Sequence, residues 1–144
     1  MDTIDSAKII KWEELENGQQ ESFEFSITED DMSLFAGFSG DKSRIHIDTG
    51  YALRNGFKAP VVYGAVIVSR LSYFVGMLLP GDYGLATDWQ FNFHHPLYVG
   101  DMATFSGEVV HLSPATRNVR LKFSVEVSGR LIVSGGAGST LLQP

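Results

Sequence analysis

The chain has 144 residues, with 11 basic and 17 acidic side chains for a net charge of −6, and it contains no cysteine. This length predicts a single domain over residues 1–144, and a hydrophobic content of 44% is enough to form a core. The lack of cysteine excludes disulfides, thiolate metal sites and a cysteine nucleophile. No run of Lys or Arg provides the clustered basic face that nucleic-acid binding needs, so nucleic acid is not an expected partner.

Two features argue against a secreted or membrane protein. The N-terminal stretch MDTIDSAKIIKWEEL lacks the basic start and apolar centre of a signal peptide. The longest apolar stretch, at residues 57–80, contains Arg70 near its middle, where a charge is costly in a bilayer. We therefore expect a cytoplasmic protein with no membrane partner.

The first third of the chain predicts one strand and one short helix. Residues 1–20 are polar and predict a loosely packed lead-in. SFEFSIT at 22–28 alternates apolar and polar side chains, as a half-buried strand does. Thr28 and Asp31 form a variant capping box for a helix that ends at Ser39-Gly40.

The next segment is compact and irregular, and it leads into an apolar helix. If RIHID at 44–48 is extended, its isoleucines point to one side and its polar residues to the other. Asp48 is a good N-cap for a helix over 49–54, which Asn55-Gly56 closes in a left-handed conformation. GAVIVSRLSYFVGMLL at 64–79 is apolar on nearly every face, so it predicts a buried central helix.

The second half of the chain predicts antiparallel strands. Alternation is strongest over residues 119–127, and it also marks 89–93 and 103–112. Gly107 predicts a bulge or a close backbone approach, and the glycines of the last strand, RLIVSGGAGSTLL, permit close packing. This order of elements predicts an α+β fold in which a curved antiparallel sheet wraps around a central buried helix.

The residues best suited to chemistry are Asp41, His46 and Asp48, which lie between the two predicted helices. Adding water to an enoyl thioester needs a group that activates water, a group that exchanges a proton at the α-carbon, and a donor for the enolate oxygen. Asp41 and His46 can serve as the first two, and the backbone N–H of Gly64 at the helix start as the third. On spacing alone, a turn role for Asp41 and a structural role for His46 are the more common alternative, and capping accounts for Asp48.

These residues and the segments after them resemble the MaoC-like dehydratases and (R)-specific enoyl-CoA hydratases, whose hydratase motif reads roughly S-G-D-x-N-P-x-H-x-D. The resembling segments are Phe38-Ser39-Gly40-Asp41, His46-Ile47-Asp48, Tyr51-Ala52, Gly56-Phe57, Val61-Val62-Tyr63-Gly64, Leu78-Leu79-Pro80-Gly81, and Phe93, Pro96, Val99, Gly100 and Asp101. They span about residues 22–142 in the family's order. The resemblance implies a hotdog fold.

The resemblance also implies an activity and its residues. Asp41 and His46 match the catalytic pair, Gly64 matches the glycine whose amide polarises the thioester carbonyl, and Ser72 falls where some members have a site serine. A bond from Ser72 to a helix carbonyl is an open alternative. The implied reaction is (R)-specific hydration of a trans-2-enoyl thioester, carried by CoA or a carrier protein, or the reverse dehydration. It needs no metal or redox cofactor, and it implies a homodimer that can assemble further.

Two departures from the family leave the substrate open. Ser43-Arg44 stands in place of Asn-Pro, and Tyr63 in place of a frequent histidine, so Ser43 and Tyr63 are further candidate site residues. The altered pair also motivates a rival function, a non-catalytic acyl-thioester binder. A hotdog thioesterase is a less favoured rival, because it needs a carboxylate on or opposite the central helix and residues 64–79 contain none.

The remaining candidates have simpler structural explanations. His94-His95 are not expected to bind a metal, because adjacent strand residues point to opposite faces. His111 is expected at the surface. The aromatic residues at 89, 91 and 93 are expected in the core or in the wall of an acyl pocket. Arg70 either pairs at a subunit interface or reaches a phosphate.

Overall fold

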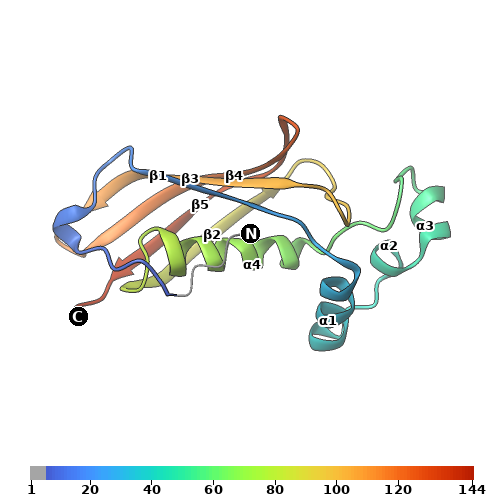
Figure 1. Cartoon of the computed structure of the whole chain (residues 1–144), viewed down its shortest axis with the longest axis horizontal. Coiled ribbons are helices and arrows are strands. Elements are labelled where there is room, and N and C mark those ends of the chain that lie inside the picture. Colours follow the sequence, from blue (N-terminus) through green and yellow to red (C-terminus); the bar gives the residue numbers. More distant parts are fainter. Residues whose placement is uncertain (1–5) are drawn as a thin grey trace.

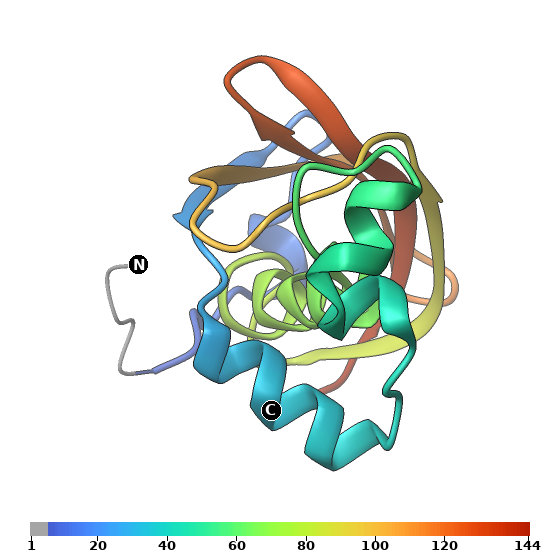
Figure 2. The ribbon, with the colours of Figure 1, turned by 90° about the vertical axis from the view of Figure 1, so that its right-hand side faces the viewer.

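A five-stranded antiparallel sheet curves around one helix in the computed structural model, which describes residues 6–144 (Figures 1 and 2). The central helix is α4 (Gly64–Tyr73). The strands are β1 (Gln20–Phe25), β2 (Gly84–Phe93), β3 (Ala103–Ser113), β4 (Asn118–Val127) and β5 (Arg130–Leu141), in the spatial order β1-β3-β4-β5-β2. The predicted α+β architecture is confirmed. Residues 1–5 of the predicted lead-in lie outside the described residues.

The central helix changes its winding and is covered on most of its surface. After Tyr73 the α-helix passes into a π-helical turn, η2 (Phe74–Leu78). Leu71 and Phe74 are fully buried against the sheet. Ala65, Ser69 and Ser72 are exposed, so one face of the helix is uncovered in the single chain. No helix in residues 6–144 is long and apolar enough to cross a membrane.

Glycines let the sheet pack closely on its inner face. A Cβ on Gly107 would overlap the ring of Phe74, which confirms the predicted close approach at this position. A Cβ on Gly135 would overlap the carbonyl oxygen of Gln90 and come within 2.7 Å of the Phe123 ring. The sheet can therefore bend around the helix only where these side chains are missing.

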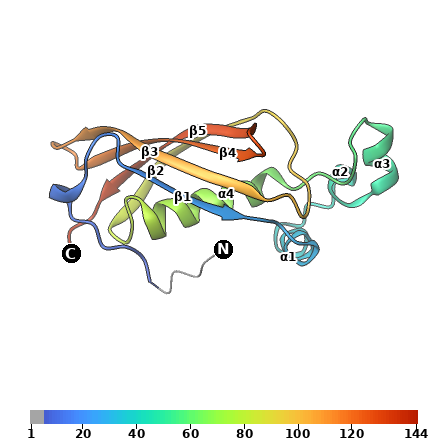
Figure 3. The same ribbon diagram turned by 45° about the horizontal axis from the view of Figure 1, so that its top comes forward.

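The three short helices α1 (Glu29–Ser39), α2 (Arg44–Ile47) and α3 (Thr49–Arg54) lie together beyond one end of the sheet, near the start of α4 (Figures 1 and 3). Thr28 and Asp31 form both bonds of the predicted capping box. The Asp48 carboxylate accepts from the N–H of Tyr51, 2.9 Å away, and so caps α3 as predicted. These local predictions are confirmed. The sequence could predict them because each depends only on residues that are neighbours in the chain.

Two local predictions are wrong. Residues 44–47 are helical rather than extended, because the N–H of Asp48 donates to the carbonyl of Arg44 over 2.9 Å and closes a turn. The lead-in is packed rather than loose over residues 6–19. Its Leu15 is 6% exposed, and the N–H of Lys8 donates to the carbonyl of Met77 at the end of η2, over 2.9 Å.

Replacing Gly135 with alanine should lower the free energy of unfolding by about 2 kcal/mol, because the backbone of β2 would have to move away from the new methyl group. Urea denaturation measures the change. The matched control is Gly37→Ala in α1, where a Cβ meets nothing within 4 Å. That variant should be stabilised by about 0.5–1 kcal/mol. Equal stability of the two variants would contradict the close contact.

Candidate active site

The carboxylate of Asp41 is held by the loop that follows α1. Gly40 ends this helix with φ 76°, and the N–H of Asp41 donates to the hydroxyl of Ser39 over 3.1 Å. The backbone N–H of Ser43 (2.9 Å) and the hydroxyl of Ser43 both donate to Oδ1 of Asp41. These bonds, the hydroxyl's first, lower the pKa of the Asp41 carboxyl, and the positive charge that His46 can carry adds to the effect. The carboxylate is therefore fixed through Oδ1, which leaves Oδ2 for a water molecule.

The imidazole of His46 is fixed by one hydrogen bond and one stacked ring. Its Nδ1 lies 2.7 Å from the carbonyl oxygen of Val61. Since a carbonyl only accepts, Nδ1 must donate, and in the neutral ring Nε2 then carries the lone pair. The ring stacks on Tyr63 with centroids 4.1 Å apart. His46 thus presents Nε2 as a proton acceptor.

Tyr63 connects the two candidate catalytic groups. It is 2% exposed, and its hydroxyl donates to the backbone carbonyl of Asp41 over 2.7 Å. Burial, and secondarily the negative charge of Asp41, raises the pKa of the Tyr63 phenol, so it stays a neutral donor. Besides stacking on His46, its ring lies 4.7 Å from that of Phe35. Tyr63, the residue that precedes α4, therefore contacts both the Asp41 loop and the His46 ring.

A cavity of about 350 Å³ lies beside His46 and the first residue of α4, Gly64. This volume is within the range of small-ligand sites. A Cβ on Gly64 would come within 3.1 Å of the ring of Phe93, so the glycine leaves room for this ring beside the helix start. The first N–H groups of a helix have no partner within it and face a ligand with the positive end of the dipole. The other lining residues are Phe57, Val61, Val62, Ile67, Phe93, His94, His95, Pro96 and Leu97.

His94 and His95 line the same cavity, which the alternation of a strand did not predict. The strand β2 ends at Phe93, so the rule of opposite faces no longer applies to the two residues after it. The ring of His94 bonds to Ser134 (Nε2 to Oγ, 2.7 Å) and that of His95 to the carbonyl of Leu131 (2.8 Å), both on β5. The signal in the sequence was the proline at 96, which ends a strand and makes its last residues irregular.

Comparisons with known proteins identify the family of the chain. A family model described as MaoC like domain matches residues 13–132. The chain belongs to this family. An (R)-specific enoyl-CoA hydratase of Rhodospirillum rubrum is 29% identical over 126 residues, which cover 88% of this chain and 88% of that protein.

Solved hydratases share the fold of this MaoC-like chain. An R-hydratase from Pseudomonas aeruginosa is 30% identical with a TM-score of 0.84, over 92% of this chain and 86% of its own. The (R)-hydratase from Aeromonas caviae is 29% identical with a TM-score of 0.83, over 88% of this chain and 97% of its own. The hotdog fold expected from the sequence is confirmed.

The structure of the MaoC-like chain does not bring every predicted site residue to the cavity. Asp41, Ser43 and Tyr63 are all absent from the cavity lining. Asp41 is linked to the lining residue His46 through Tyr63, whose hydroxyl bonds to Asp41 and whose ring stacks on His46. Ser72 is exposed on α4 and bonds to no carbonyl in the described residues, so its role stays a prediction. Arg70 has a buried Nε without a partner in residues 6–144, and its guanidinium lies 5.5 Å from the Phe25 ring. His111 is exposed on β3, as expected.

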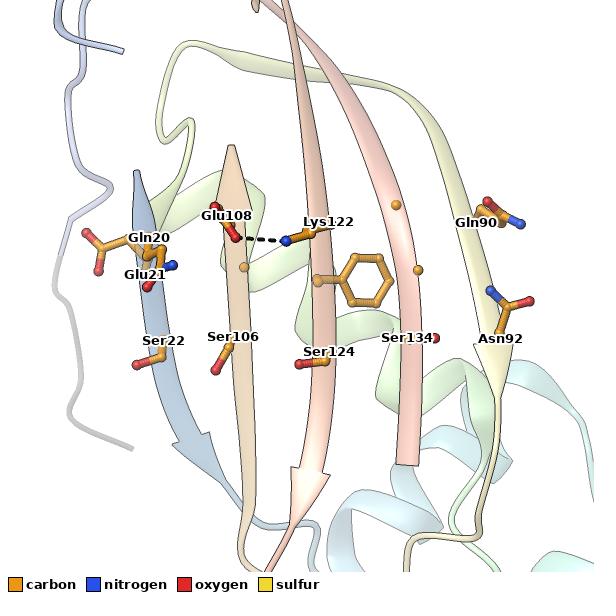
Figure 4. Close-up of a pocket in the computed structure, with 14 residues that line it drawn as sticks. Gln20, Glu21, Ser22, Gln90, Asn92, Ser106, Glu108, Lys122, Ser124 and Ser134 are labelled. Atoms are coloured by element: carbon orange, nitrogen blue, oxygen red, sulfur yellow. Dashed lines mark ion pairs between the residues drawn. The ribbon is translucent and has the colours of Figure 1, made fainter. Parts of the chain in front are cut away.

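A larger hollow, of about 740 Å³, lies on the outer face of the sheet, away from α4 (Figure 4). Small polar side chains in register across all five strands create it: Ser22, Ser106, Ser124, Ser134 and Asn92. Glu108 and Lys122 form an ion pair there over 3.1 Å. The imidazole bonded to one of these serines, that of His94 on Ser134, lines the smaller cavity instead of this hollow. The smaller cavity also has His46 and the start of α4 in its lining, so it is the stronger candidate for catalysis.

Replacing Ser43 with alanine should raise the pKa of the Asp41 carboxyl, because the largest contribution that lowers it is lost. The Asp41 carboxylate would then protonate at a higher pH than in the native protein. A carbon-detected NMR titration of the Asp41 carboxyl measures this. Ser43→Thr keeps the hydroxyl and should keep the low pKa, and Ser33→Ala, exposed on α1, is the control. An unchanged titration in Ser43→Ala would contradict the role of the hydroxyl.

Proposed function

We propose that this protein adds water to trans-2-enoyl thioesters to give (R)-3-hydroxyacyl thioesters, or catalyses the reverse dehydration. The observation that carries the proposal is the cavity lined by both Gly64, at the start of α4, and His46, whose Nδ1 bonds to Val61. Relatives named as an (R)-specific enoyl-CoA hydratase and a 3-hydroxybutyryl-CoA dehydratase support the reaction type. The protein is then a hydro-lyase whose substrate is an acyl thioester.

In this mechanism Asp41 positions and activates the water. Its Oδ1 is occupied by Ser43, so Oδ2 accepts a hydrogen bond from water and orients the water oxygen toward C3 of the enoyl group. The lowered pKa keeps the carboxyl ionised at neutral pH, as this role requires. A water molecule held in this orientation has already lost its translational and rotational entropy, so this loss no longer adds to the activation barrier.

His46 and Gly64 act on the other side of the double bond. As the water oxygen bonds to C3, negative charge moves to the thioester oxygen, where the N–H of Gly64 stabilises it. A proton from the water passes through the Asp41–His46 pair, and a proton is delivered to C2, which completes the addition of H and OH. Acid–base help of this kind contributes about 10²–10⁴-fold to the rate.

The two rival functions have weaker support. A thioesterase would need a carboxylate facing the thioester carbonyl, and α4 contains neither Asp nor Glu. A non-catalytic binder was motivated by Ser43-Arg44. Ser43 nevertheless keeps a hydrogen bond to Asp41, and Arg44 pairs with Asp48 over 3.5 Å, so neither residue disturbs the candidate pair.

We also propose a homodimer, which can assemble further, in the cytoplasm. The exposed face of α4, where Ser72 lies, and the edge strand β2 are uncovered in the single chain. On β2, Leu85 is 56% exposed. Exposed apolar side chains beside an unpaired strand edge favour pairing with a second copy. Such a copy would enclose Ser72, which fits its predicted place in the site.

Asp41→Asn and His46→Gln should each lower kcat/KM for the hydration of crotonyl-CoA by at least about 100-fold, because each removes one partner of the proton transfer. Loss of absorbance of the enoyl thioester measures the rate, and chiral analysis of the product should give the (R) form. His111→Gln, an exposed histidine outside the cavity, is the control and should keep full activity. Full activity in both site variants, or release of free thiol instead of hydration, would refute the proposal.

In sedimentation equilibrium the native protein should behave as a particle of at least twice its chain mass of 15.8 kDa. The exposed Leu85 of β2 provides the reason, so Leu85→Lys should shift the equilibrium toward the single chain. Leu53→Lys, at an exposed leucine on α3, is the matched control. A native protein that sediments at 15.8 kDa over the micromolar range would contradict the dimer.

A further inference from the structure

Three of the four histidines of the chain line one cavity, and the proposed hydration uses only His46. The other two, His94 and His95, are exposed, as is the neighbouring Phe93. By contrast, the lining residues Val62, Ile67 and Leu97 are buried. The cavity therefore opens beside residues 93–95, and these two imidazoles are the polar groups at its open side.

His95 is fixed in the same way as His46. Its Nδ1 lies 2.8 Å from the carbonyl oxygen of Leu131, so Nδ1 donates, and Nε2 has no hydrogen-bond partner within residues 6–144. Its backbone N–H also donates to the carbonyl of Ile132 over 3.3 Å. In His94 the hydroxyl of Ser134 already occupies Nε2. Of the two exposed imidazoles, His95 is therefore the one whose Nε2 can accept a hydrogen bond from a ligand.

A thioester substrate has one apolar end and one polar end. With its carbonyl at Gly64 and its reacting carbons at His46, the acyl chain fits the apolar wall, and the thiol-derived arm must leave through the open side. In CoA and in carrier proteins this arm is phosphopantetheine, which contains two amides. An amide that enters a partly apolar cavity needs hydrogen-bond partners, or it loses the bonds it made to water.

We propose that Nε2 of His95 binds an amide N–H of the pantetheine arm and thereby selects thioesters that carry it. This inference rests on the proposed function, since it needs the thioester carbonyl at Gly64. It gives His95 a role in binding rather than in proton transfer, so the effect belongs in KM and not in kcat. The phosphate groups take no part in this contact, and a CoA thioester and a pantetheine thioester should therefore depend on His95 equally.

The test uses variants that separate the two ring nitrogens. In His95→Asn the side-chain amide can still donate to the carbonyl of Leu131, but nothing replaces Nε2. His95→Gln places a polar atom near Nε2 instead. For crotonyl-pantetheine and crotonyl-CoA, His95→Asn should raise KM about five- to tenfold, as expected for one hydrogen bond. His95→Gln should recover part of the loss, and His111→Asn is the control with no effect.

The S-propyl thioester of crotonic acid has no amide, so its turnover should be the same in native protein and His95→Asn. An equal loss with this thioester would show a merely structural role for His95 and overturn the inference. A loss with crotonyl-CoA alone would assign the residue to phosphate and overturn it too, as would no loss at all. Calorimetric binding of butyryl-pantetheine, which cannot be hydrated, keeps the test separate from catalysis. Weaker binding in His95→Asn would support the contact even if the native protein showed no hydratase activity.

Discussion

The candidate site depends on the buried side chain of Tyr63. Its hydroxyl holds the backbone of Asp41, and its ring supports the imidazole of His46. It is also the residue immediately before α4, so the helix start at Gly64 is fixed by the same contact. A loop and a helix from different parts of the chain thus meet at one aromatic ring. A phenol can do this because it combines a large apolar surface with one polar atom that still finds a partner.

The sheet determines where that ring can lie. Its inner face must accommodate α4 and η2, and it does so by leaving out side chains at Gly107 and Gly135. The helix then fills the curve of the sheet (Figure 2), and its first turn projects toward α1, α2 and α3 beyond the sheet end. The cavity forms between this first turn and the segment that follows β2. Packing in the core and the geometry of the site are therefore parts of one arrangement.

The departures from the family motif are chemically compatible with the site. Ser43 reaches the Asp41 carboxylate with both its N–H and its hydroxyl, which a short side chain can do when the backbone turns back on itself. Arg44 lies at the start of α2, where its guanidinium pairs with Asp48 and lies 4.3 Å from the centre of the Tyr51 ring. The charge that Arg44 adds is thus engaged on the outside of the short helices, at a distance from the cavity lining.

The elements that the residue pattern predicts correctly are those with local causes. The capping box at Thr28, the cap at Asp48, the alternation of β4 and the apolar run of α4 all depend on residues a few positions apart, and the structure has each of them. The resemblance to the MaoC-like dehydratases predicted the family and the fold, because the matching motifs keep their order over most of the chain. Local patterns are less informative where a short segment can be either extended or helical. At residues 44–47 one backbone hydrogen bond closes a helical turn.

Which side chains share the site depends on contacts between segments that lie far apart in the chain. The contact of Tyr63 with Asp41 joins residues 22 positions apart, and the bond of His95 to Leu131 joins residues 36 apart, so no pattern within a segment reports either. The apolar run of α4 likewise predicts burial without indicating which group covers each face of the helix. Hydrophobic periodicity records that a surface is to be buried, while the identity of the group that buries it is fixed by the folded chain.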